Sequence, residues 1–299
     1  MLTNPFFMSK LILFSLFSSL VLIGCQEPSP SPFNNNTIAA AHPLASLAGK
    51  KMFEQGGNAF DAAVAAGFAL AVVEPSMSGI GGRLQAIYHL TSGEIGGVDA
   101  STQVPSNYQP TAEKYSSGYK TIGIPGVVAG LLKLQKEHGQ LPLKKVMEPA
   151  IEYAENGFQI LAGEAYRQQM AKEVFKQYEG TKTHFLDSQG ASFQAGDTVV
   201  QKTLASTLKV ISLNGKSGFY EGEVAQKMVE DIQSNGGLLT LEDLKNYKAL
   251  DAEVFQGIFQ GLNVHALNLP SYGAITIQIL QILDHLAIAE SEEEWASQI

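Results

Sequence analysis

Apolar positions at helical spacing predict that the folded part of the chain begins with two helices. Apolar side chains recur every third or fourth residue over 44–52, and the glycine pair at 56–57 follows where a helix end favours a left-handed residue. Asn58 is then placed as an N-cap, with the carboxylate of Asp61 in the first helical turn and an alanine-rich stretch behind it. We expect this second helix to be buried and to end before Pro75.

A change to a period of two predicts a β-hairpin next. The loop 76–82 leads into a strand over 84–90, the polar segment 91–94 supplies the turn, and 95–100 returns as the second strand. The same alternation is found once more over 254–269, where we expect another pair of strands.

The remaining periodic segments predict helices. Helical patterning is found at 126–135, 143–156, 202–213, 222–235 and 274–288. The segment 181–198 lacks such a pattern, and we expect a loop there. Many helices with a few hairpin strands are typical of the α+β class.

Composition fits a globular domain and argues against a nucleic-acid partner. The chain has 299 residues, 45% of them hydrophobic and 16% charged, which allows a sizeable core. Its formal net charge is −9, and lysine and arginine do not cluster along the sequence. We therefore expect neither nucleic acid nor an anionic membrane surface as a partner.

The first residues have the features of a bacterial lipoprotein signal. Lys10 precedes an apolar run over 11–24 that is short for a membrane span but typical of a signal peptide. The run ends in Leu-Ile-Gly before Cys25, the only cysteine, and this sequence resembles a lipobox in which the thiol receives a diacylglyceryl group. A Pro/Ser-rich segment follows. We expect a signal peptide at 1–24, a linker at 25–36 and a folded domain at 37–299.

The residue after the cysteine bears on where the protein is anchored. Gln26 offers no inner-membrane retention signal, so we expect a lipid anchor in the outer membrane and a domain that faces the periplasm. The alternative is an ordinary cleaved signal in which Cys25 has no role. A catalytic role for Cys25 is disfavoured, because a flexible linker cannot hold a nucleophile against oxyanion donors and acylation would block it.

The sequence offers no familiar cofactor or metal motif. The histidines show no pair at metal-ligand spacing: His42, His89, His138, His184, His265 and His285. The glycine-rich stretch 79–82 lacks the Lys-Ser/Thr of a P-loop and leads into a strand, which disfavours a nucleotide site. Because no Gly-x-Ser-x-Gly occurs, an α/β-hydrolase triad is also disfavoured. We expect neither cofactor nor metal.

An ordered set of short motifs spans the predicted domain. They are GGNAFDAAVAA at 56–66, VEP at 73–75, SGIGG at 78–82, IPGVVAG at 124–130, PAI at 149–151, GF at 157–158, GFY at 218–220, GGLLT at 236–240 with Asp243, Leu244 and Tyr247, and LPSYG at 269–273. In this order they resemble the γ-glutamyltranspeptidase family, from about His42 to about His285. Each motif alone is weak, but the ordered set is specific.

The resemblance implies a fold and a chemistry. The fold is the amino-terminal-nucleophile αββα sandwich, built from two subunits cut out of one precursor. A threonine freed by the cleavage attacks a γ-glutamyl amide such as that of glutathione, its own α-amine takes the proton, and the acyl group passes to water or an amino acid. In the family this threonine lies beyond the region matched here, and no Thr-Thr-His-like segment occurs in the chain. We therefore expect a large-subunit portion, incomplete at its C-terminus, without a catalytic residue of its own and in need of the small-subunit segment.

The substrate-binding segment departs from the family pattern. Members with transpeptidase activity carry an arginine that grips the substrate's α-carboxylate, in a segment shaped like Asp-x-Arg-Glu. Here Ser101 stands at the arginine position, followed by Thr102, and a hydroxyl cannot replace a charged fork. Arg83 is the candidate replacement, since the hairpin could bring it beside Ser101. That Arg83 is merely a solvated strand-end charge remains an equal alternative.

Two hypotheses for the whole protein follow. In the first, the chain is part of a precursor that cleaves γ-glutamyl or related small amides. In the second, it is a catalytically inactive lipoprotein that keeps the scaffold as a binding or vestigial module.

Overall fold

The computed structural model describes residues 36–110 and 115–285. The predicted signal peptide and Cys25 lie outside the described residues. By its internal contacts the chain divides between Thr37 and Ile38, and all helices and strands described below belong to the unit that begins at Ile38.

The first two predicted helices are confirmed, together with the cap between them. Helix α2 spans Pro43–Glu54 and helix α3 spans Ala59–Val73. The Asn58 side chain accepts hydrogen bonds from the backbone N–H groups of Phe60 and Asp61, and the Asp61 carboxylate accepts one from Asn58 N–H. This reciprocal capping box defines where α3 begins.

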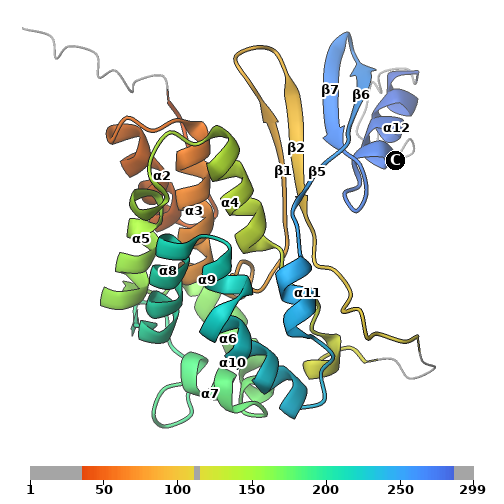
Figure 1. Cartoon of the computed structure of the whole chain (residues 1–299). Coiled ribbons are helices and arrows are strands. Elements are labelled where there is room, and N and C mark those ends of the chain that lie inside the picture. The colour runs from red at the N-terminus through yellow and green to blue at the C-terminus, as the bar shows by residue number, and fades with distance from the viewer. Residues whose placement is uncertain (1–35, 111–114, 286–299) are drawn as a thin grey trace, which may run out of the picture. The chain divides into compact units, whose positions relative to one another are not determined.

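Helices make up most of the rest of the unit that begins at Ile38 (Figure 1). They are α4 Val127–His138, α5 Leu143–Asn156, α6 Ala162–Phe175, α7 Glu179–Phe185, α8 Lys202–Asn214, α9 Ser217–Tyr220, α10 Gly222–Ser234, α11 Leu241–Asn246 and α12 Gly273–Asp284, with a short 3₁₀ turn at Tyr119–Thr121. Helix α3 packs against α2, α4 and α5, and α5 packs against α8. We call α2, α3, α4, α5 and α8 the helical body.

Within the described residues the strands form three small antiparallel sheets. Strands β1 (Leu84–His89), β2 (Ile95–Ala100) and β5 (Leu250–Asp251) form the first, β3 (Phe158–Gln159) and β4 (Thr198–Val199) the second, and β6 (Val254–Phe259) and β7 (Leu262–Leu267) the third. Both predicted strand pairs are confirmed. The β1–β2 hairpin lies along α4, and α12 packs on β6 and β7 (Figure 1).

Two predictions about this part of the chain were wrong or incomplete. The expected loop at 181–198 begins inside α7 and ends in β4, and α7 escaped detection because it is short and buries none of its residues. Helix α6 was not predicted. It buries Glu164, Ala165 and Gln168, so its inward face is largely polar and gives no apolar periodicity. The last residues predicted for α12, 286–288, lie outside the described residues.

The mixture of helices and small antiparallel sheets confirms the α+β class. The core is centred on α3, where Val64, Phe68 and Val72 are fully buried. Burial of such side chains against the neighbouring helices is the main favourable term for the helical body.

Candidate functional site

The predicted substrate-binding residues lie where the β1–β2 hairpin opens. Leu84 pairs with Ala100 at the last position of the ladder, so Arg83 and Ser101 leave the hairpin at the same end. The carbonyl of Gly82 accepts hydrogen bonds from the N–H groups of Gly126 at 2.8 Å and Val127 at 3.1 Å, the N-cap and the first residue of α4. We call Arg83, Ser101 and Thr102 the hairpin end.

Ser101 is held by its near neighbour Asp99 and by Tyr247 from a distant segment. The Asp99 carboxylate accepts hydrogen bonds from Ser101 N–H at 2.9 Å and from Ser101 Oγ at 2.6 Å. The Tyr247 hydroxyl, which comes from the end of α11, donates to the Ser101 carbonyl at 2.8 Å. Because the Ser101 hydroxyl gives its proton to Asp99, it can accept but cannot also donate to a substrate carboxylate. Its geometry thus supports no direct replacement of the family's arginine.

The residues after Ser101 lie against the segment that leads into α4. Gln103 and Ile124 form an isolated antiparallel bridge. A Cβ added to Gly123 would lie 2.8 Å from the Gln103 carbonyl oxygen and 2.4 Å from Thr102 Cγ2, so this close approach of the two backbone segments favours glycine at that position. Thr102 itself is exposed.

Gly126 makes a second close approach. An added Cβ would lie 1.9 Å from the Ala100 carbonyl oxygen and 2.4 Å from the Tyr247 hydroxyl. Tyr220 supports the same turn, because its hydroxyl donates to the Pro125 carbonyl at 2.8 Å and accepts from Ala129 N–H at 3.2 Å. The Ile-Pro-Gly motif therefore serves to place the start of α4 against the end of β2.

The two buried tyrosines stay neutral over a wide pH range. Their rings stack with centroids 5.6 Å apart. Burial, and secondarily the negative charge of Asp99, raises the pKa of Tyr247 to about 12. Burial also raises the pKa of Tyr220. Tyr247 therefore remains a hydrogen-bond donor to Ser101 under all ordinary conditions.

Arg83 differs from its neighbours at the hairpin end. It is exposed, and it forms no hydrogen bond or ion pair with any of the described residues, Ser101 included. Its guanidinium donors are thus available to an incoming carboxylate. The structure brings Arg83, Ser101 and Thr102 to one end of the hairpin but does not join them by direct contacts.

Two further searches concern the part of the chain that the structure describes. No group of three or more His, Cys, Asp or Glu side chains there could hold a metal ion. None of the helices within 36–110 and 115–285 has the length and apolarity needed to cross a membrane. The loop before Arg83 forms an ordinary turn, in which Gly82 N–H donates to the Gly79 carbonyl.

Sequence reasoning did not identify the residues that position the hairpin end. Tyr247, Gly126 and Asp99 all belong to segments that the sequence comparison had marked, yet Tyr247 is far from Ser101 along the chain. The only sequence signal that pointed to these three residues was their position in the family motifs. A pattern along the sequence cannot show that they meet in space.

The whole domain matches one family. The family model described as gamma-glutamyltranspeptidase matches residues 45–299, and the chain belongs to this family. The resemblance that its motifs suggest is thus confirmed.

Individual relatives agree with the family match. The chain is 34% identical over 262 residues to the glutathione hydrolase proenzyme of Escherichia coli, covering 83% of this chain and 45% of that protein. It is 32% identical over 272 residues to the capsule biosynthesis protein CapD proenzyme of Bacillus anthracis, covering 88% and 48%. The chain therefore spans about half the length of these curated relatives.

A solved structure supports the same assignment. The fold is similar to the crystal structure of Helicobacter pylori gamma-glutamyltranspeptidase, with a TM-score of 0.84 and 35% sequence identity, covering 88% of this chain and 80% of that chain.

Proposed function

We propose that this chain forms the large-subunit part of an enzyme that hydrolyses or transfers the γ-glutamyl group of amides such as glutathione. The nucleophile is a threonine on a small-subunit segment that joins this chain. Support comes from the family match over 45–299 and from relatives named glutathione hydrolase proenzymes. The observation that supports the proposal is the hairpin end, where the exposed Arg83 leaves the ladder at the same end as Ser101, the residue at the predicted arginine position.

The proposed reaction divides acyl transfer into two steps. The threonine Oγ attacks the γ-carbonyl carbon, its α-amine takes the proton, and the amide C–N bond breaks with that proton going to the leaving amine. Water or an amino acid then attacks the acyl-enzyme ester and regenerates the threonine. This chain contributes the binding of the γ-glutamyl donor.

Arg83 is the proposed partner of the donor's α-carboxylate. A guanidinium can bind a carboxylate through two parallel charged hydrogen bonds, which neither Ser101 nor Thr102 can supply. Its exposure and its lack of a partner among the described residues fit a group reserved for a ligand.

The apolar outer face of α12 is the proposed contact for the small-subunit segment. Ile275, Ile279 and Ile282 are exposed on this helix, whereas Ile277 packs on Gly257 of β6. Apolar faces of this kind mark interaction sites in soluble proteins. Since the chain spans 45% of the Escherichia coli relative, we propose that the segment corresponding to the remainder covers this face and completes an αββα sandwich.

Kinetics of the complete enzyme, this chain together with the small-subunit segment, test the proposal. We expect hydrolysis of a γ-glutamyl anilide, and we expect Arg83→Ala to raise KM at least about tenfold with little change in kcat, since it removes binding of the substrate carboxylate. Arg83→Lys should recover part of the loss because it keeps the charge.

Two outcomes of this experiment have different meanings. Lys176→Ala, which removes an exposed cation elsewhere, is the matched control and should leave KM unchanged. An unchanged KM in Arg83→Ala would remove the proposed role of Arg83 alone. Absence of anilide hydrolysis by the complete enzyme would overturn the proposed function itself.

We also propose that the protein is held at the outer membrane through a lipid on Cys25, with the folded unit in the periplasm. The support is the lipobox-like sequence before the only cysteine. Labelling of cells with a radioactive fatty acid should mark the wild-type protein and leave Cys25→Ala unlabelled. Equal labelling of both proteins would contradict the anchor.

A further inference from the structure

A pocket of about 680 Å³ lies beside α4 and carries an unusual concentration of positive charge, and no residue of the hairpin end is among its lining residues. Its lining includes Lys133 and Lys136 of α4, Lys216 just before α9, and Lys248 just after α11. Glu137 is the one acidic residue among the lining residues. The pocket is therefore positively charged, whereas the chain as a whole has a formal net charge of −9.

Two nearby carboxylates already form ion pairs with one of these lysines. Lys133 Nζ lies 2.6 Å from Glu137 Oε1 and 2.8 Å from Asp251 Oδ1. Lys136, Lys216 and Lys248 form no ion pair with any residue in the described part of the chain. Three ammonium groups thus line one pocket without an ion-pair partner among the described residues.

Lys216 is the most constrained of the three. Its Nζ donates to the Lys245 carbonyl at 3.4 Å and lies 5.6 Å from the centre of the Tyr220 ring. Burial is the main cause that lowers its pKa; Glu221 opposes this effect and the second cation, Lys248, adds to it. An anion placed between the two lysines would relieve both the loss of hydration and the repulsion.

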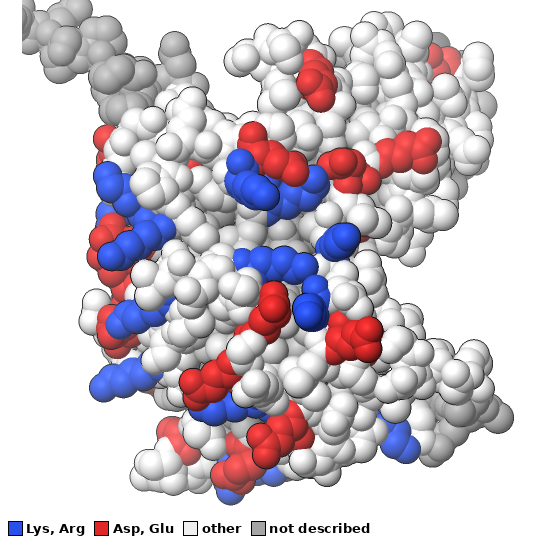
Figure 2. All heavy atoms as spheres, viewed as in Figure 1, with Lys and Arg blue, Asp and Glu red and all other residues white. Residues whose placement is uncertain are grey.

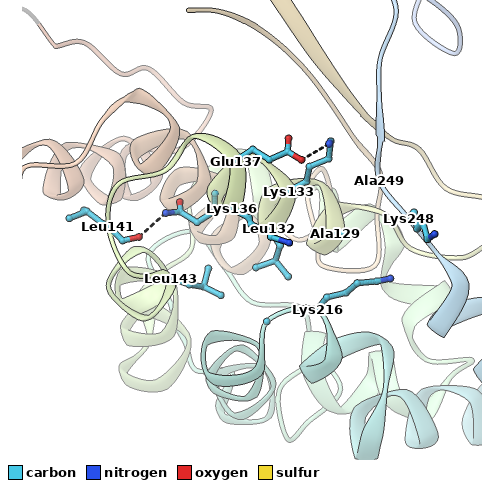
Figure 3. Close-up of a pocket in the computed structure, with 12 residues that line it drawn as sticks. Ala129, Leu132, Lys133, Lys136, Glu137, Leu141, Leu143, Lys216, Lys248 and Ala249 are labelled. Carbon is cyan, nitrogen blue, oxygen red and sulfur yellow. Dashed lines mark hydrogen bonds and ion pairs between the residues drawn. The ribbon is translucent and has the colours of Figure 1, made fainter.

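The figures show how the cations are arranged. In the close-up, Lys216 extends along the pocket toward Lys248, whereas Lys133 turns away to Glu137 (Figure 3). In the space-filling view, basic side chains gather around a hollow in this face of the molecule, with acidic side chains on either side of it (Figure 2). At physiological ionic strength charges are screened over about 8 Å, so distant acidic residues do not cancel the local potential.

The pocket also has the size and the walls of a small-molecule site. Its volume lies within the range of about 300–1,000 Å³ common for such sites. Leu132, Leu143 and Ala129 add apolar surface to the lining. A compact ligand with several negative groups on a short carbon or phosphate frame matches this combination.

We propose that this pocket binds a small polyanion, whose carboxylate or phosphate oxygens are met by the ammonium groups of Lys136, Lys216 and Lys248. The site is independent of the acyl chemistry proposed above. Its lysines are dispersed along the sequence and come together only through the packing of α4, α9 and α11.

Titration calorimetry on the full chain tests the site, with citrate, pyrophosphate and inorganic phosphate as probes and glycerol as a neutral control. We expect saturable binding of citrate or pyrophosphate that weakens as salt is added. Preference for one of the two probes distinguishes a carboxylate ligand from a phosphate ligand. Lys136→Gln combined with Lys248→Gln should weaken binding at least about tenfold, because two charged hydrogen bonds are lost.

A second double variant, with two lysines replaced outside the pocket, serves as the control. Lys176→Gln combined with Lys202→Gln makes the same change of charge at exposed positions outside the pocket and should leave the dissociation constant unchanged. Both double variants replace exposed side chains, so folding should persist, and circular dichroism checks this. Equal weakening in the two double variants, or no binding of any anion by the wild-type chain, would overturn the proposal.

Discussion

Helices α3 and α12 are both strongly apolar, yet only α3 is buried. Helix α3 packs against α2, α4 and α5, and Phe68 in its centre is 0% exposed. Among the described residues, the main contacts of helix α12 are with β6 and β7, and Ile279 on its outer side remains 51% exposed. An apolar helix therefore shows a need for cover, but its sequence does not show which part of the protein provides that cover.

The inner side of α12 is packed as closely as a core. A Cβ added to Gly257 of β6 would lie 2.4 Å from Ile277 Cγ2, so the helix sits directly on the strand backbone there. Ile275, Ile279 and Ile282 are exposed on the same helix. Within the described residues the helix is thus closely packed on one side only, which is why we propose the small-subunit segment as the partner of its other side.

Alanine substitutions in the two helices test this difference in burial most directly. Phe68→Ala leaves a cavity in the helical body and should lower the free energy of unfolding by about 3–5 kcal/mol. Ile279→Ala removes a side chain that is already half in water, and in this chain alone it should cost less than about 1 kcal/mol. Denaturant unfolding followed by circular dichroism measures both. A cost for Ile279→Ala as large as that for Phe68→Ala would mean that α12 is covered within the chain itself.

A second pair of variants compares buried and exposed carboxylates. Asp61 is fully buried and accepts hydrogen bonds from the side chain of Gln135 at 2.7 Å and from the N–H groups of Asn58, Gln140 and Leu141. Asp61→Ala would leave these donors without a partner and should lower the free energy of unfolding by about 2–4 kcal/mol.

The control for this pair lies in α12. The Asp284 carboxylate accepts one exposed hydrogen bond from Gln260 N–H at 3.1 Å. Asp284→Ala should therefore change the free energy of unfolding by less than about 0.5 kcal/mol. If the two substitutions cost the same, the hydrogen bonds to Asp61 do not hold the loop after α4 in place.

Local signals made much of the fold predictable. The Asn58 capping box and the turn of the β1–β2 hairpin depend on residues close together in sequence, and both were located correctly. Local signals did not predict helix α6, because the helix buries the polar side chain of Glu164 where an apolar one would be expected. The Glu164 carboxylate accepts hydrogen bonds from Ser76 Oγ at 2.5 Å and from the Gln168 side chain at 2.7 Å. Hydrogen bonds stabilise the inward face of α6, and they leave no periodic apolar pattern in the sequence.

The candidate sites were predictable only in part. The hairpin register follows from the turn, so the proximity of Arg83 and Ser101 could be anticipated. The contact of Tyr247 with Ser101 and the gathering of Lys136, Lys216 and Lys248 could not, because each depends on how distant helices pack. Local chemistry sets the elements, whereas tertiary packing decides which side chains share a site.

The smallest effect that we predict concerns the start of α11, and it depends on pH. Helix α11 begins with a full capping box, whereas α12 has no side-chain cap. Burial alone would raise the pKa of Asp243, but hydrogen bonds from Ser106 N–H and from Thr240 outweigh it and hold the pKa below its ordinary value of 3.8. A lowered pKa in the folded state stabilises the protein above the ordinary value, and this contribution is lost as the pH falls through the folded-state pKa. Asp243→Asn should therefore cost about 1 kcal/mol at neutral pH. The difference from wild type should shrink below about pH 4, as measured by denaturant unfolding over a series of pH values. A difference that stays constant down to the acid end would show that the Asp243 charge does not stabilise the cap.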